Sequence, residues 1–408
     1  MVTVWVGALA LLVGCNAYHP RPPDPPSFLP RVRTETQGPV RVSVAALGAV
    51  ESREHFGMDL AARGIQPVWV EIENRSPVTL YLLSSAIDPA YFSAREAAYQ
   101  AHRAFRAAAN RQMDELLEAQ AIDREIPAGR TQSGFVFTNH DERTKFVTVQ
   151  LYGERRTHSF NFLLDVPGIR TDSDTVEFAA LYPADQVVEL DDEAALGRAL
   201  ERFPRCTTRR DGTGCGDALN FVLIGTSDEV GGTLVGAGWQ VTEAMGPGAM
   251  WRTLKAFALG QRYRYSPMSA LYVFGRRQDA GFQKARDSIH QRNHLRLWLT
   301  PLRFQGRDVW LGAISRDIGV YFTPRAWSFT THAIDPDVDE AREALTEDLI
   351  TSQAVHAVGY MRGMSQASAD RPHRNLMNAP YWTDGRRAVF LFDAEPTSLG
   401  DIEFFDWE

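Results

Sequence analysis

The chain has 408 residues, of which 44% are hydrophobic and 23% are charged, and these proportions are typical of a globular protein. Its length is sufficient for two domains, each with its own hydrophobic core. The formal net charge of −8 excludes general nucleic-acid binding, because that function needs a basic surface.

Residues 1–15 have the features of a bacterial lipoprotein signal. Val4 to Leu12 is an apolar run of nine residues, which is too short to span a bilayer but suits the core of a signal peptide. It leads into Leu12-Val13-Gly14-Cys15, which looks like a lipobox and makes Cys15 the expected lipidation site. The alternative is a buried N-terminal strand.

Residues 16–37 are expected to form a proline-rich tether. Prolines at positions 20, 22, 23, 25, 26 and 30 favour extended polyproline geometry. At about 3.1 Å per residue, this segment would hold the body roughly 40 Å from a membrane anchor. Signal, cysteine and spacer together predict an exported, lipid-anchored envelope protein, and Asn16 favours the periplasmic face of an outer membrane.

The other two cysteines fit an oxidising compartment. Cys206 and Cys215 flank a turn-rich loop that a disulfide would close. Loop-closure entropy gives such a bond about 2.7 kcal/mol of stabilisation. The alternative is two free thiols.

Residues 38–170 have the period-two alternation of half-buried strands. Strands are expected at 40–44, 68–72, 135–137, 147–151 and 160–164. The pattern predicts an all-β, immunoglobulin-like sandwich with a spacer or binding role. A helical insert is expected from Ser93 to Gln120, beginning with a capping box of Ser93 and Glu96.

Residues 171–408 mix helical and strand-like patterns, which predicts an α+β domain with a mostly antiparallel sheet backed by helices. Helices are expected at Asp191–Phe203 and at Asp337–Ser352. Strands are expected at 221–225, 271–274, 293–299, 309–313 and 388–392.

Positive charge is concentrated in one part of this second domain. Residues 251–316 contain thirteen Lys and Arg against three Asp and Glu, whereas residues 333–408 contain six against fifteen. Either the two segments pair across the fold, or the arginines line a cleft for an anionic ligand, since guanidinium groups suit phosphate and carboxylate oxygens. The candidate ligand-binding residues are Arg276, Lys284, Arg292, Arg296, Trp298 and Trp310.

Histidines among these charges suggest a catalytic or metal site. On the expected strand, His294, Arg296 and Trp298 share the face opposite three leucines. A hydrolase would use His294 as general base, His332 with Asp335 as a second arm, and Arg296 as the oxyanion clamp. A divalent metal would be held by His294, His332 and Asp335. Alternatively, His294, Arg296 and Asp335 form a buried polar network that stabilises the fold.

Spaced motifs in this region resemble the LssY carboxy-terminal domain family. They are Ser266-Pro267, Tyr272-Val273-Phe274-Gly275-Arg276, Gln278-Asp279, Gln283-Lys284-Ala285-Arg286, Arg292, His294-Leu295-Arg296-Leu297-Trp298, Val309-Trp310, Asp317, His332 and Ile334-Asp335-Pro336-Asp337-Val338-Asp339. The resemblance covers about Cys206 to Ala354, and Asn293 with His294 stands where the family has paired histidines. Similar domains have no settled activity and are found fused to membrane segments of the DedA or phosphatidic-acid-phosphatase type, which implies the envelope and phosphorylated lipids.

The first functional hypothesis is therefore an accessory or binding module for an anionic envelope lipid or polysaccharide, attached to a membrane by its lipid anchor. A phosphoryl or ester hydrolase, metal-assisted or dependent on histidine, is the second hypothesis. A structural module with a buried polar network is the third.

Overall fold

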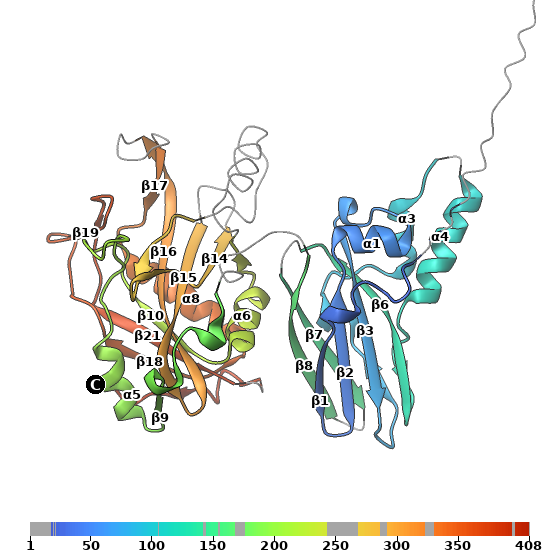
Figure 1. Ribbon diagram of the computed structural model, residues 1–408, viewed down its shortest axis with the longest axis horizontal. Coiled ribbons are helices and arrows are strands. Elements are labelled where there is room, and N and C mark those ends of the chain that lie inside the picture. Colours follow the sequence, from blue (N-terminus) through green and yellow to red (C-terminus); the bar gives the residue numbers. More distant parts are fainter. Residues whose placement is uncertain are drawn as a thin grey trace, which may run out of the picture. The chain divides into compact units, whose positions relative to one another are not determined.

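A computed structural model describes residues 18, 20, 22–104, 106–141, 144–153, 156–167, 176–242, 268–285, 292–322, 330–393 and 396–407. The chain divides into two compact units, Met1–Gly168 and Ile169–Glu408 (Figure 1). No helix in the described ranges is long and apolar enough to cross a membrane. Cys15 of the expected lipobox lies outside the described residues.

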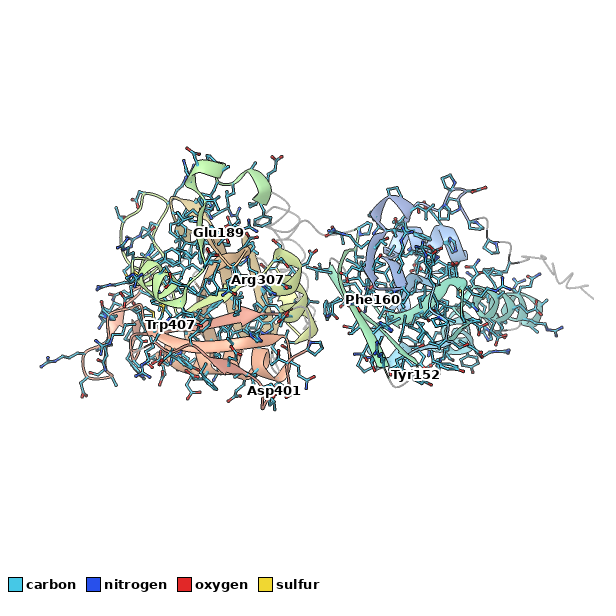
Figure 2. The ribbon with its side chains drawn as sticks, turned by 90° about the horizontal axis from the view of Figure 1, so that it is seen from below. Tyr152, Phe160, Glu189, Arg307, Asp401 and Trp407 are labelled. Atoms are coloured by element: carbon cyan, nitrogen blue, oxygen red, sulfur yellow. A yellow bond between two sulfur atoms is a disulfide. The ribbon has the colours of Figure 1, made fainter. Side chains whose placement is uncertain are left out.

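The first unit contains two four-stranded antiparallel sheets. One has the order β1 (Arg33–Gln37), β2 (Val40–Ala46), β3 (Ile65–Asn74) and β6 (Arg130–Asn139). The other has the order β5 (Glu125–Ile126), β4 (Leu80–Leu82), β7 (Thr144–Gly153) and β8 (Arg156–Asp165). Both sheets contribute to one hydrophobic cluster, which includes Phe160, a residue labelled in Figure 2. The period-two alternation thus arises because each sheet turns one face to a shared core.

The described helices of this unit are α1 (Ala49–Phe56), α2 (Ser84–Ile87), α3 (Ala94–Ala101) and α4 (Ala107–Gln120), with 3-10 turns at Leu29–Arg31 and Ala61–Arg63. The insert expected over 93–120 is therefore two helices. Ser93 begins α3 by accepting a hydrogen bond from the Glu96 N–H at 3.1 Å. The Asn110 side chain bonds both the N–H and the carbonyl of Arg103, each at 3.0 Å, and thereby stabilises the turn between α3 and α4.

The last part of the expected tether belongs to this first unit. Residues 33–37 form β1, which pairs along its whole length with β2. Phe28 is buried in a second hydrophobic cluster, and Arg31 forms an ion pair with Glu51 at 2.5 Å. The tether expected over 16–37 therefore does not extend to residue 37. Prolines indicate where regular structure is disfavoured, but burial of Phe28 and pairing of β1 determine where the unit begins.

The second unit is built on a mixed sheet of ten strands among the described residues. Its order is β11 (Gln240–Val241), β14 (Ala280–Ala285), β15 (Arg292–Phe304), β16 (Arg307–Phe322), β10 (Phe221–Ile224), β21 (Arg386–Phe392), β18 (Val355–Arg362) and β22 (Glu403–Phe404), with β17 (Thr330–Ile334) beside β16 and β9 (Val188–Leu190) beside β15. Three neighbouring pairs are parallel, namely β10 with β21, β9 with β15 and β22 with β18. The other pairs of this sheet are antiparallel.

Two small hairpins accompany this sheet. They pair β12 (Tyr272–Val273) with β13 (Arg276–Arg277), and β19 (His373–Arg374) with β20 (Pro380–Tyr381). Short 3-10 turns lie at Phe178–Ala180 and Ala184–Gln186. The described part of the chain is thus a mixed α/β protein.

Helices cover both faces of the large sheet. On one face, α6 (Ser227–Gly236) and α8 (Val338–Thr351) pack with the leucines of β15 in one hydrophobic cluster. On the other face, α5 (Glu193–Glu201) packs with Trp298 and Leu311 in a separate cluster. The expected core stripe of α8 is fully buried at Ala341, Leu345 and Leu349. Because both faces are covered, β15 lies in the interior of the unit.

Arg387 is a fully buried cation whose described partners are backbone carbonyls. Its guanidinium donates to the carbonyls of Leu219 (2.7 Å) and Leu200 (2.9 Å), and also to those of Phe203 and Pro204. Burial, together with a smaller effect of a neighbouring arginine, lowers the pKa of Arg387 to about 10. Arg387 therefore joins the end of α5 to strands β10 and β21, where the carbonyl end of a helix favours a cation.

Replacing Arg387 by Met should lower the free energy of unfolding of the second unit by roughly 3 kcal/mol, because several buried carbonyls lose their donor. Urea unfolding followed by tryptophan fluorescence would measure this loss. The exposed neighbour on the same strand provides the control, and Arg386→Met should change stability by less than about 0.5 kcal/mol. Equal urea midpoints for the two variants would contradict this role of Arg387.

Candidate functional site

Polar side chains gather on one face of the sheet where β14, β15 and β16 lie side by side. In the register of these strands, His294 lies opposite Gln283 on β14 and opposite Ser315 on β16. Side chains of a strand alternate between its two faces, so Arg292, His294 and Arg296 project from the same face of β15. This is the face on which Trp298 lies in the core.

His294 is held by a carboxylate. Its Nε2 lies 2.7 Å from Oδ2 of Asp317 on β16, and its Nδ1 lies 3.1 Å from Sδ of Met268. The side chains of His294 and Asp317 are 15% and 5% exposed. A buried carboxylate that hydrogen-bonds one nitrogen of an imidazole fixes the orientation of the ring.

The two flanking arginines are almost completely buried. Arg296 Nη1 lies 3.2 Å from Oδ2 of Asp217, and Arg292 Nη1 donates to Oε1 of Gln283 at 2.8 Å. Burial lowers the pKa of Arg292, and the carboxylate of Asp317 acts in the opposite direction. We refer to Arg292, His294, Arg296, Asp217 and Asp317 as the β15 cluster.

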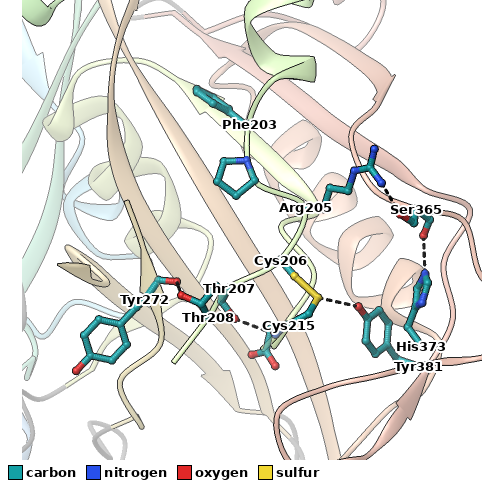
Figure 3. The surroundings of a disulfide bond; sticks show 12 residues. Phe203, Arg205, Cys206, Thr207, Thr208, Cys215, Tyr272, Ser365, His373 and Tyr381 are labelled. Atoms are coloured by element: carbon teal, nitrogen blue, oxygen red, sulfur yellow. Dashed lines mark hydrogen bonds between the residues drawn. A yellow bond between two sulfur atoms is a disulfide. The ribbon is translucent and has the colours of Figure 1, made fainter. Parts of the chain in front are cut away.

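A disulfide-closed loop brings Asp217 to this cluster. Cys206 and Cys215 are joined by a disulfide, the pair expected from the sequence (Figure 3). Beside the disulfide, the N–H of Thr207, inside the loop, donates to the Asp217 carbonyl, and the N–H of Asp217, just after the loop, donates to Thr207 Oγ1, both at 2.9 Å. The position of the Asp217 carboxylate therefore depends on local backbone contacts beside the disulfide.

A small pocket adjoins the β15 cluster. Its lining includes Asp217, Ser315, Ile334, Asn375 and Tyr381, and it has room for about one water molecule. Ser315 lies opposite His294 in the sheet, and Ile334 on β17 lies opposite Asp317. The pocket is therefore next to the cluster and shares Asp217 with it.

Two expected ligand-binding residues have structural partners instead. The Arg276 guanidinium donates to both carboxylate oxygens of Asp279 (2.9 and 2.8 Å) and to the Tyr182 hydroxyl (2.8 Å). Lys284 Nζ lies 2.7 Å from Oδ1 of Asp348 on α8. These ion pairs link elements of the fold, so Arg276 and Lys284 have a structural role, and their expected contact with a ligand stays a prediction.

Trp298 and Trp310 are core residues, not ligand contacts. Their exposed fractions are 0% and 3%, and their indole N–H groups donate to the carbonyls of Arg276 (3.4 Å) and Gly225 (3.2 Å). The sequence pattern placed Trp298 with His294 and Arg296 on the face of β15 opposite the leucines, as a candidate ligand-binding residue. This face is buried as well, because α5 covers the half of it that carries Trp298.

The described part of the basic segment is paired across the fold. Arg307, labelled in Figure 2, contacts Glu229 at 3.1 Å and Asp393 at 3.4 Å. Arg316 contacts Glu340 at 3.8 Å. Of the two explanations for the charge map, the structure favours pairing for these residues. Arg252, Lys255, Arg262, Arg264 and Arg286 of the same segment lie outside the described residues.

The expected metal set is only partly described. The backbone of His332 lies in β17 opposite Val320, but its side chain is outside the described part of the structure. Asp335 Oδ1 accepts a hydrogen bond from the Asp337 N–H at 3.1 Å, and the carboxylate that contacts His294 is Asp317 instead. Among the described side chains, no group of three His, Cys, Asp or Glu could hold a metal ion.

Sequence reasoning did not assign Asp217 or Asp317 to the site. Asp317 belongs to the motifs that carry the family resemblance, but its role was not inferred. Asp217 stands two residues after Cys215, and its proximity to the expected disulfide was the available signal. Both carboxylates reach the cluster through tertiary contacts.

The second unit is thus a mixed α/β domain with a charged, largely buried cluster on one face of its sheet. Residues 199–386 match the family described as LssY C-terminus, and this part of the chain is an LssY C-terminus domain. The match confirms the resemblance inferred from the motifs, and it includes the whole β15 cluster. A comparison with curated proteins finds no match for the chain.

Replacing Asp217 by Asn should lower the free energy of unfolding by about 3 kcal/mol, because it leaves Arg296 buried without its carboxylate. Adding Arg296→Met to this variant should recover part of the loss, with a coupling energy of about 1–3 kcal/mol in a double-mutant cycle measured by urea unfolding. Asp211→Asn, an exposed position in the disulfide loop, is the matched control. Additive effects of the two substitutions would contradict the ion pair.

Proposed function

We propose that the LssY C-terminus domain is a binding module for an anionic group, a phosphate or a carboxylate, held by Arg292, His294 and Arg296. The observation that carries this proposal is the placement of these three side chains at alternate positions on one face of β15. The β15 cluster thus sets two guanidinium groups and an imidazole on one strand face, with the carboxylates of Asp217 and Asp317 against Arg296 and His294. The N–H groups of guanidinium and imidazole suit the oxygens of a phosphate or a carboxylate.

The charge of the segments that join these strands in the sequence also supports an anionic ligand. The described strands β14 and β16 end at Ala285 and Phe322, and β15 and β17 resume at Arg292 and Thr330. A third segment lies between Thr242 and Met268. The Thr242 N–H donates to the carbonyl of Gly281 on β14, and Met268 Sδ contacts His294 on β15. The three intervening segments, 243–267, 286–291 and 323–329, contain six Lys and Arg against two Asp and Glu. This surplus of positive charge in the sequence favours an anionic ligand.

The proposal includes a place in the cell envelope. It rests on the apolar run before Cys15, the lipobox-like motif and the proline-rich segment, together with the disulfide in the second unit. The first unit, with its two antiparallel sheets and shared core, would form an immunoglobulin-like sandwich that acts as a spacer or partner surface. The ligand would then be an anionic envelope molecule, such as a lipid phosphate or a polysaccharide.

Inorganic phosphate, titrated calorimetrically into the protein at low ionic strength, should bind to a single saturable site. Arg292→Gln and Arg296→Gln should each weaken this binding at least tenfold, because each removes a charge-assisted contact. Binding should also weaken as salt is added, since the attraction is electrostatic.

The matched control is Arg303→Gln, which removes the same charge from the far end of β15, where the side chain is 43% exposed. It should leave phosphate binding unchanged. Melting temperatures of all variants would show whether the fold is retained. The proposal fails if phosphate does not bind, or if Arg303→Gln and Arg296→Gln weaken binding equally in folded protein.

The contact between His294 and Asp317 favours a second function, hydrolysis of a phosphoryl or ester bond. An imidazole oriented by a carboxylate is the usual arrangement of a general base. To activate a water molecule, Nδ1 of His294 would exchange its contact with Met268 for that water. Arg296 would stabilise the developing negative charge.

If the domain is a hydrolase, Asp317→Asn should lower kcat at least about 100-fold on p-nitrophenyl phosphate or p-nitrophenyl acetate. The sequence predicted Asp335 as the catalytic carboxylate, whereas the structure places Asp317 against His294. Asp335→Asn is therefore the comparison variant, because Asp335 hydrogen-bonds within its own turn. Its kcat should be unchanged. An absence of turnover in the native protein, or equal losses in both variants, would argue against Asp317 as the orienting carboxylate.

A further inference from the structure

The pocket beside the β15 cluster is positioned to contact a ligand bound there. Asp217 is one of the residues that line the pocket, and its carboxylate pairs with Arg296 at 3.2 Å. Ser315, a second lining residue, is the direct neighbour of His294 across the β15–β16 pair. A molecule held by Arg296 and His294 would therefore have its adjacent atoms at the mouth of this pocket.

The pocket has hydrogen-bonding groups of complementary kinds. Tyr381 and Ser315 are lining residues that carry hydroxyl groups, and they are 8% and 6% exposed. Burial raises the pKa of Tyr381, and the nearby Asp217 acts in the same direction, so the phenol keeps its proton and can donate it. The Asp217 carboxylate can only accept. A single hydroxyl group can satisfy both, because it donates one hydrogen bond and accepts others.

The Tyr381 hydroxyl is available for such a contact. The partner shown for it is Sγ of Cys215 at 3.9 Å, in the disulfide (Figure 3). Disulfide sulfur is a weak acceptor, so this contact competes poorly with a ligand oxygen. The disulfide and the β20 hairpin thus hold the hydroxyl in place while leaving its hydrogen-bonding capacity for a ligand.

The size of the pocket limits the group that it can take. It has room for about one water molecule, and its remaining walls include Ala218, Ile314, Val338 and Pro380. A sugar ring or a second phosphate is too large, and a charged amine would lie against apolar walls. A single hydroxyl substituent fits both the volume and the polar groups.

We propose that this pocket is a hydroxyl subsite, and that the ligand of the domain is a polyol phosphate, a phosphate ester with a free hydroxyl group close to the phosphorus. The phosphate would lie at Arg292, His294 and Arg296, and the hydroxyl would displace water from between Asp217 and Tyr381. This inference rests on the proposed anion-binding function and adds the chemical class of the ligand. A free glycerol phosphate and a phosphatidylglycerol headgroup share this chemistry.

Calorimetric titration of the full chain with three soluble probes tests the subsite. Inorganic phosphate reports on the anion site alone, glycerol 3-phosphate adds hydroxyl groups, and propyl phosphate has the same chain length without them. Glycerol 3-phosphate should bind at least tenfold more tightly than propyl phosphate, because the polar groups of the pocket stay unpaired with the latter.

Tyr381→Phe and Ser315→Ala each remove one hydroxyl from the pocket. Both should reduce the preference for glycerol 3-phosphate over propyl phosphate to less than about threefold, while the affinity for inorganic phosphate stays at its original value. Tyr360→Phe is the matched control, because it removes a half-buried phenol that contacts Glu343 on α8. It should keep the full preference.

Equal affinities for glycerol 3-phosphate and propyl phosphate, with phosphate binding intact, would overturn the hydroxyl subsite and leave the anion site standing. No binding of inorganic phosphate would overturn the proposed function and the subsite with it. Displacement of bound glycerol 3-phosphate by phosphatidylglycerol vesicles, but not by phosphatidylcholine vesicles, would identify a lipid headgroup as the source. Failure of both vesicles to displace it would identify a soluble polyol phosphate.

Discussion

Burial of both faces of β15 is the constraint on which the rest of the second unit depends. The leucines of this strand pack against α6 and α8, and Trp298 packs on the opposite face beneath α5. A charge on such a strand is removed from water and must find a partner within the protein. Arg296 therefore lies against Asp217, and His294 lies against Asp317.

The same requirement explains much of the charge distribution. A segment with many arginines is tolerated in the interior because acidic residues from other elements reach it. Lys284 is paired with Asp348 on α8, and Arg276 is paired with Asp279 in its own hairpin region. Arg307 is paired with Glu229 on α6 and with Asp393 just after β21. The buried charge of Arg387 is stabilised differently, because its guanidinium donates to backbone carbonyls near the end of α5 and has no carboxylate among its described partners.

Asp217 connects three features that are separate in the sequence. It follows the disulfide loop, neutralises Arg296 and lines the pocket beside Tyr381. A group that is shared between an ion pair and a pocket makes ligand binding and local stability interdependent. The loop after Cys206 thus has a positioning role for the candidate site, in addition to the entropy that its cross-link removes from the unfolded chain.

Local patterns in the sequence determined the elements. Alternation over 40–44, 68–72 and 147–151 marks real strands, and the stripe of Ala341, Leu345 and Leu349 marks a real helix, because these periods depend only on neighbouring residues. Residue motifs also identified the LssY C-terminus domain. Only the tertiary structure decided that Trp298 is in the core and that Asp217 and Asp317 are the partners of Arg296 and His294. Those partners are separated by 79 and 23 residues in the chain, and strand order, which no local period encodes, brings them together.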